Sequence, residues 1–172
     1  FPIEANLDDW SNYMSANNKD HRVVSWVRFQ PEFLHKFDRD ADAFPTPRSL
    51  ERTSDILQWN LNEDDLYQTA SASLFTHLRL HDKCPDIDEL IKDPEGINLP
   101  EEIAIQYATV SSLVNRVNDK NIGAMLKFLN RLDGEFLAYF IKDSVAKNRE
   151  LLQNKELRIE MANNQKLREL VL

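Results

Sequence analysis

The fold class that the sequence predicts is all-α. Only three glycines occur among the 172 residues, and apolar residues recur at spacings of three and four along almost the whole chain, as they do on one face of a helix. Hydrophobic residues make up 42% and charged residues 29% of the chain, a balance typical of folded globular proteins. The length fits one domain or two small ones.

The beginning of the chain predicts two helices. Residues 7–16 are expected to form a helix with Trp10 and Met14 on one face. Asp20 is the predicted N-cap of the next helix, which carries an apolar set at Val23, Val24, Trp26, Val27 and Phe29. Pro31 interrupts this helix and starts a short helical piece that ends at residue 37.

A loop and two further helical patterns follow. Residues 38–46 are expected to form the loop. Thr46 is the predicted N-cap of the next helix, with Pro47 at its first position, and the apolar face of this helix ends near Trp59. Apolar residues then fall four apart on a core-facing stripe, at Leu66, Ala70, Leu74 and Leu78.

The last seventy residues predict a small helical bundle. Apolar spacing indicates helices at residues 103–117 and 122–132, which we expect to pack as a hairpin. Another helix begins near Gly134, with Phe136, Phe140 and Ile141 on a wide apolar face. A more polar helix is expected at about residues 155–170.

The charge of the chain excludes some classes of partner. With 21 basic and 29 acidic residues, the net charge is −8 and the pI is about 5.0, so we expect no binding of nucleic acid through a positive surface. No run reaches the roughly 18 apolar residues of a membrane span, and we expect no membrane insertion. Eight acidic and two basic groups lie in residues 82–102, which indicates an acidic connecting loop with one short helix at residues 87–91.

The ends and the cysteine content suggest a compartment. Cys84 is the single cysteine, and no basic-then-apolar signal segment opens the chain, so we expect a reducing compartment and, by default, the cytoplasm. The chain begins at Phe1 without a methionine. We therefore expect it to be part of a longer polypeptide.

The most informative local sequence surrounds Arg48. If Thr46 caps its helix, Arg48 lies in the first turn, where the helix dipole already presents positive partial charge. A nearby carboxylate would offset this charge, either Glu51 or an acid of the preceding loop at Asp38, Asp40 or Asp42. The alternative is a phosphate group, which a helix N-terminus and a guanidinium bind together.

Two segments around this helix resemble a known family. Residues 27–38 (VRFQPEFLHKFD) and 44–51 (FPTPRSLE) are similar to the region that follows the core of bacterial and phage AAA+ ATPases, in the neighbourhood of the MoxR-type group. The similarity continues through Pro85–Ile91 with Asp93-Pro94, Leu99–Glu101 and Leu126–Asp143, and Phe1–Glu4 resembles the end of the last core strand. It therefore covers most of the chain.

The resemblance assigns a role to Arg48. In those proteins a Pro-Arg pair at the start of a lid helix supplies the sensor-2 arginine, which reaches the terminal phosphates of the nucleotide. Arg48 is the matching residue and the single cofactor-binding residue that we expect here. Leu50 departs from the family pattern, in which a tryptophan is usual at this position.

The resemblance also implies an organisation and a set of partners. Residues 1–58 would form the helical lid and residues 59–172 a helical extension of a chaperone or remodelling ATPase. The longer protein would use ATP and magnesium, assemble as a ring, often a hexamer, and cooperate with a protein that bears a von Willebrand A domain. The chain has no Gly-x-x-x-x-Gly-Lys-Ser/Thr motif. No catalytic residue is therefore assigned within it, and the phosphate loop, the magnesium-binding acids, sensor 1 and the arginine finger are expected upstream of Phe1.

Two alternative hypotheses remain, one about the function of the chain and one about a metal site. The chain can instead be an autonomous helical interaction module with no nucleotide role, which recognises a protein through the acidic segment 82–102 or a groove in the bundle 103–145. A lid separated from its core would expose apolar surface beside Trp10 and Phe44. His77, His81 and Cys84 have the spacing of metal ligands, but histidines near a helix C-terminus are favourable without a metal, and we assign no metal site.

Overall fold

The structure, a computed structural model, describes residues 5–35, 44–59 and 72–164. All regular secondary structure in these ranges is helical, which confirms the all-α prediction. The elements of the first half are α1 (Leu7–Ala16), α2 (His21–Phe29), the 3-10 helix η1 (Pro31–Leu34), α3 (Pro47–Gln58) and α5 (Ala72–Leu80). Those of the second half are η2 (His81–Lys83), α6 (Ile87–Lys92), α7 (Ile103–Arg116), α8 (Ile122–Leu129), α9 (Gly134–Lys147), η3 (Arg149–Gln153) and α10 (Lys155–Asn163).

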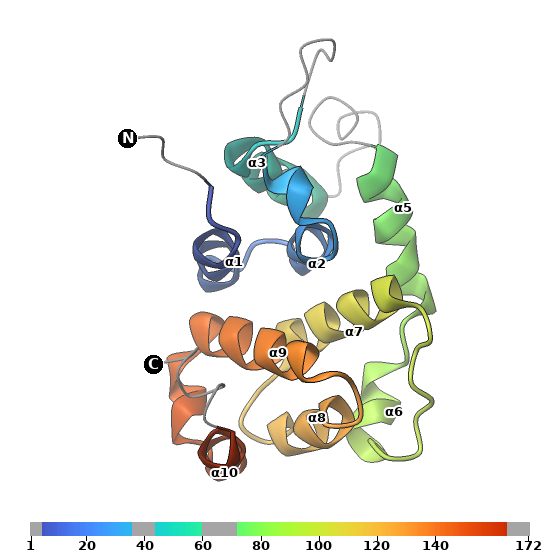
Figure 1. Cartoon of the computed structure of the whole chain (residues 1–172), viewed down its shortest axis with the longest axis vertical. Helices are drawn as coiled ribbons and strands as arrows, with labels where there is room; N and C mark the ends of the chain where they lie inside the picture. The colour runs from blue at the N-terminus through green and yellow to red at the C-terminus, as the bar shows by residue number, and fades with distance from the viewer. Residues whose placement is uncertain (1–4, 36–43, 60–71, 165–172) are drawn as a thin grey trace.

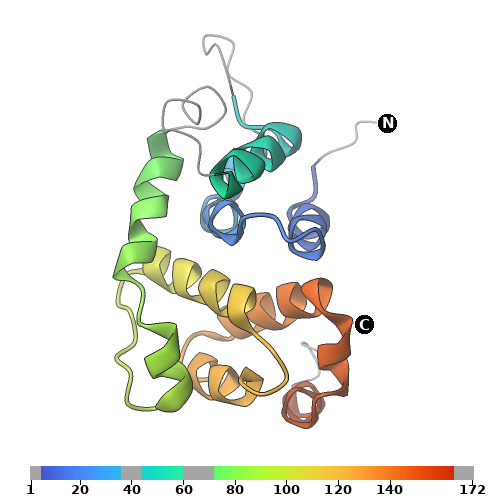
Figure 2. The ribbon, with the colours of Figure 1, turned by 180° about the vertical axis from the view of Figure 1, so that it is seen from behind.

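The helices lie in stacked layers. Figure 1 shows α3 above α1 and α2, then α7 and α9 in a middle tier, and α6, α8 and α10 below them, with α5 along one side. The reverse view in Figure 2 shows the same order. The middle tier is therefore covered on two sides by helices from different parts of the sequence.

Side-chain caps explain where several helices begin. The carboxylate of Asp20 accepts a hydrogen bond from the Arg22 amide at 2.9 Å, which confirms the predicted cap of α2. Asp86 caps α6 in the same way and accepts from the amides of Asp88 and Glu89. Each such cap satisfies amides that the helix itself leaves unpaired.

The apolar residues form two main clusters. The first joins α1, α2, α3 and α5, with Met14, Trp26, Leu50 and Leu74 fully buried in it. The second is larger and is built by α6 to α10. Because Leu74 lies beyond residue 58 yet packs in the first cluster, α5 adds to the core of the N-terminal helices; the boundary after residue 58 stays a prediction.

The predicted pairing of the helices at 103–117 and 122–132 was wrong. α7 packs most extensively against α2 and α9, and α8 packs against α6, α9 and α10. The physical reason is that α7 is buried on two sides. On one side the Ser111 hydroxyl donates to the His21 carbonyl of α2 at 2.7 Å, and on the other side Leu113 belongs to the bundle core.

Other predicted elements differ in their bounds or lie outside the described residues. The short piece after Pro31 is a 3-10 helix that ends at Leu34. The predicted strand end at Phe1–Glu4, the loop at 38–43, the start of the stripe at Leu66 and Ala70, and the helix end at 165–170 lie outside the described residues. None of the described helices has the length and apolar character that crossing a membrane requires.

Candidate functional site

The first turn of α3 holds the predicted site residue Arg48. Thr46 is in extended conformation, and its hydroxyl accepts a hydrogen bond from the Ser49 amide at 3.1 Å. The Ser49 hydroxyl accepts in return from the Thr46 amide at 2.8 Å. This reciprocal capping box and Pro47 at the first helical position fix the start of the helix, so the predicted cap is confirmed.

Arg48 extends from this turn with its side chain exposed. No carboxylate in the described ranges forms an ion pair with it. Glu51, one of the predicted partners, is engaged elsewhere: the Tyr13 hydroxyl donates to it at 2.7 Å and the Lys19 ammonium lies at 3.1 Å. The other predicted partners, Asp38, Asp40 and Asp42, lie outside the described residues.

The electrostatics of Glu51 agree with this geometry. The hydrogen bonds from Tyr13 and Lys19 are the main causes that hold the pKa of Glu51 below its usual value, and the charge of Arg48 is a smaller one. The same contact with Glu51 raises the pKa of Tyr13. The guanidinium of Arg48 is thus near Glu51 but free of it, in a turn that carries positive partial charge.

Polar contacts join α3 to the turn between α1 and α2. Lys19 bridges Glu51 and Asp55, with 2.7 Å to the latter. The Asp20 amide donates to the Ser54 hydroxyl at 2.5 Å, and the Gln58 amide donates to the Asn18 carbonyl at 2.7 Å. α3 is therefore tied along its length to the helices beneath it.

A buried ion pair connects α2 with α9. Arg28 donates from Nη2 to Asp143 Oδ1 at 2.5 Å and from Nε to Asp143 Oδ2 at 3.3 Å. The guanidinium lies 4.5 Å from the centre of the Tyr139 ring, and Ser15 donates to Asp143 at 3.4 Å. Asp143 is 1% exposed. Burial raises the pKa of its carboxyl, and Arg28 opposes that rise.

The sequence analysis did not predict the Arg28–Asp143 pair. Arg28 and Asp143 are 115 positions apart in the sequence, so no local pattern links them. A signal was present in α2, because Arg28 interrupts a mainly apolar stretch. A charge in the buried face of a helix requires a partner.

Three histidines meet beside the first cluster. His81 lies 5.4 Å from His21 and 5.7 Å from His77, measured between ring centres. His77 Nε2 is 2.8 Å from Ser25 Oγ, and His21 Nδ1 is 2.7 Å from Ser111 Oγ. Burial is the main cause that lowers their pKa values, to about 4 for His21 and His77 and about 3 for His81.

The structure therefore brings His77 and His81 together, with His77 buried and His81 half-buried. The Cys84 thiol donates a hydrogen bond to the Leu80 carbonyl at 3.7 Å. Burial raises the pKa of this thiol, which disfavours the thiolate form that binds metals. Within the described ranges, no group of three metal-ligating side chains has a geometry that could hold an ion.

A polar cleft of about 470 Å³ lies next to these histidines. Its walls come from the α1–α2 turn, the end of α3 and α7, and they include His21, Arg22, Gln58, His81 and Asn115. Its charged residues are paired: Arg22 binds Asp20 at 2.7 Å, and Lys19 binds Asp55. The cleft thus offers hydrogen-bonding groups rather than net charge.

Large exposed apolar side chains occur in both halves of the described chain. Tyr13 is 47% and Trp59 69% exposed in the first half, and Ile103 is 58% and Ile159 50% exposed in the second. Trp10 is buried and Phe44 is half-buried. No protein-family model, curated protein or solved structure matches the chain.

Proposed function

We propose that the chain is the helical lid and extension of an AAA+ ATPase of the MoxR-like neighbourhood, in which Arg48 senses the terminal phosphates of the nucleotide. The observation that carries this proposal is the exposed guanidinium of Arg48 in the capped first turn of α3, without an ion pair to a described carboxylate. The resemblance of residues 27–38 and 44–51 to the post-core region of such ATPases supports it.

The chemistry of the turn suits this role. Amides at a helix N-terminus carry positive partial charge and bind anions, and a guanidinium binds phosphate oxygens through paired hydrogen bonds. A phosphate would relieve the repulsion between Arg48 and the helix dipole. The presence or loss of that phosphate then favours one position of the lid over another, which is differential binding to two conformations.

Movement of α3 has a route to the rest of the chain. Contacts of Lys19, Asp20 and Asn18 tie α3 to α1 and α2. The Arg28–Asp143 pair and the packing of α1 and α2 on α9 and α7 continue this connection into the bundle. In this proposal the lid moves together with the extension, which passes the motion to a partner protein.

The remaining machinery lies outside this chain in the proposal. ATP and magnesium bind a core with a phosphate loop upstream of Phe1, the subunits form a ring, and a protein with a von Willebrand A domain is a candidate partner. The chain alone then has no hydrolytic activity. A strand followed by Gly-x-x-x-x-Gly-Lys-Ser/Thr upstream of Phe1 in the reading frame is the simplest expected finding.

The direct test is ATP turnover by the longer protein with Arg48→Ala. Because the side chain is exposed, the fold should be intact, and loss of a charge aimed at the reacting phosphate should lower turnover by about 100-fold or more. Arg52→Ala is the matched control, since Arg52 is also exposed, one turn further along α3. Normal turnover in Arg48→Ala, or equal loss in both variants, would contradict the proposal.

A further inference from the structure

A second surface of the molecule has the form of a binding groove. It has a volume of about 350 Å³ and lies between the start of α6, the segment that precedes α7 and the first turn of α7. Its apolar lining comes from Pro85, Ile97, Leu99, Pro100 and Ile105.

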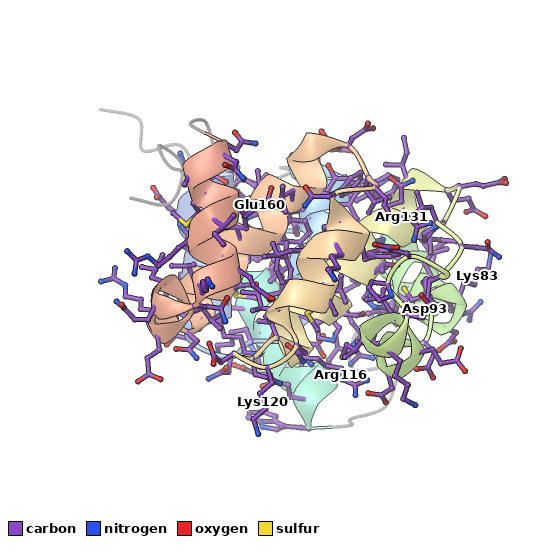
Figure 3. All side chains as sticks on the ribbon, turned by 90° about the horizontal axis from the view of Figure 1, so that it is seen from below. Lys83, Asp93, Arg116, Lys120, Arg131 and Glu160 are labelled. Atoms are coloured by element: carbon purple, nitrogen blue, oxygen red, sulfur yellow. The ribbon has the colours of Figure 1, made fainter. Side chains whose placement is uncertain are left out.

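The walls of this groove are held in place by hydrogen bonds. Arg131 Nη1 donates to the carbonyls of Pro94 at 2.7 Å and Ile97 at 2.9 Å, and the Gln106 side chain donates to the Pro100 carbonyl at 2.7 Å. Figure 3 shows Lys83, Asp93 and Arg131 along the same side of the molecule, the side that carries α6. A groove with fixed walls costs less ordering on binding.

The rim of the groove is acidic. Asp86 and Glu89 line it, with Lys83 as its one basic lining residue, and the exposed Glu101 and Glu102 follow Pro100 directly. In residues 82–102 the one described ion pair joins Asp88 to Arg116. Glu89, Glu101 and Glu102 form no ion pair with a described residue, so their charge is available to a ligand.

We propose that this groove binds an extended segment of a partner protein in which apolar and basic side chains alternate. Side chains of an extended segment point in opposite directions in turn. One set would fill the apolar floor, and the long, flexible basic side chains of the other set would bend back to the carboxylates of the rim. This docking surface is independent of Arg48 and of the nucleotide role proposed above.

The charge of the groove selects this occupant over others. A second copy of the chain, with net charge −8, would bring like charges together, and a nucleic acid would be repelled in the same way. A volume of about 350 Å³ is near the lower end of small-molecule pockets, which enclose most of their ligand. An open groove with an acidic rim suits a peptide better.

The test is fluorescence anisotropy with the complete chain and three labelled peptides of about ten residues. The probe alternates lysine and leucine; one comparison peptide alternates lysine and glycine, and the other alternates glutamate and leucine. Each is titrated against the wild type, Glu89→Lys and Glu95→Lys, whose folding is checked by circular dichroism. Glu95 is exposed in the same acidic segment but does not line the groove, so its variant has the same change in charge.

The expected result is saturable binding of the lysine-leucine probe with a Kd below about 100 μM. Glu89→Lys should weaken it about tenfold, and Glu95→Lys by less than about twofold. Absence of binding, equal weakening by both variants, or equal binding of either comparison peptide would overturn the proposal. Because no nucleotide is present, none of these outcomes bears on Arg48.

Discussion

The pair formed by Arg28 and Asp143 concentrates several interactions at one point. Asp143 accepts from Arg28 and from Ser15, and Arg28 also approaches Asp8 at 3.6 Å. Asp8 in turn binds Lys142 at 2.7 Å, and this hydrogen bond is the main cause that lowers the pKa of Asp8. A buried charge is tolerated in the fold only while its partner compensates it, and loss of the partner destabilises the fold.

Removal of one charge from this pair should therefore destabilise the fold. We expect Asp143→Asn to lower the free energy of unfolding by about 3–5 kcal/mol, because the guanidinium of Arg28 stays buried without its counter-charge. Urea denaturation measures the change. Glu150→Gln, an equal loss of charge at an exposed position of η3, should cost less than about 0.5 kcal/mol. A loss below about 1 kcal/mol in Asp143→Asn would contradict the role assigned to the pair.

At this scale the sequence predicts local contacts and misses distant ones. The cap at Thr46 and the place of Arg48 in the first turn of α3 depend on neighbours within four residues, and the sequence predicts them. The Arg28–Asp143 pair depends on how α2 and α9 pack, which no spacing within either helix encodes. The same limit applies to His21, which joins His81 across 60 positions of sequence.

Among the elements, the helices follow the apolar spacing closely. The predicted helices at 7–16 and 87–91 correspond to α1 and α6. What spacing does not predict is which helix covers a given face. α7 shows this, because its buried residues surround more than half of the helix and α2 covers the side that a hairpin would leave exposed.

The histidines link α2, α5 and η2, and they predict how this junction responds to pH. Their pKa values in the folded chain, about 4, 4 and 3, lie below the ordinary value of 6.5. Between these limits the unfolded chain binds protons that the folded chain does not, so stability falls as pH falls from about 6.5 towards 4. Each histidine contributes up to about 1.4 kcal/mol per pH unit.

Urea denaturation at pH 7.5 and pH 5 measures this dependence. We expect the difference between the two stabilities to become smaller in His77→Gln, whose side chain can still bond to Ser25. His35→Gln is the control, since His35 is exposed and outside the cluster. The nearby charges of Asp20 and Arg22 act in opposite directions on His21, so the slope reports mainly burial. An unchanged difference in His77→Gln would contradict this account.

For the molecule as a whole, two apolar clusters and the polar contacts between them form one connected structure. The N-terminal helices rest on α7 and α9, and Figure 2 shows this arrangement from behind. The fold class follows from composition and spacing alone. The arrangement of the tiers does not, because it depends on distant pairs such as Arg28 with Asp143 and Ser111 of α7 with His21 of α2.

The central proposal for the whole molecule is that the position of the lid changes with the bound nucleotide through Arg48. Isothermal titration of the proposed longer ATPase with a non-hydrolysable ATP analogue and with ADP tests it most directly. In Arg48→Ala, affinity for the analogue should fall about tenfold or more, with a smaller loss for ADP, because in the proposal the guanidinium binds the terminal phosphate. Unchanged affinity for the analogue, or an equal loss for both nucleotides, would contradict the account.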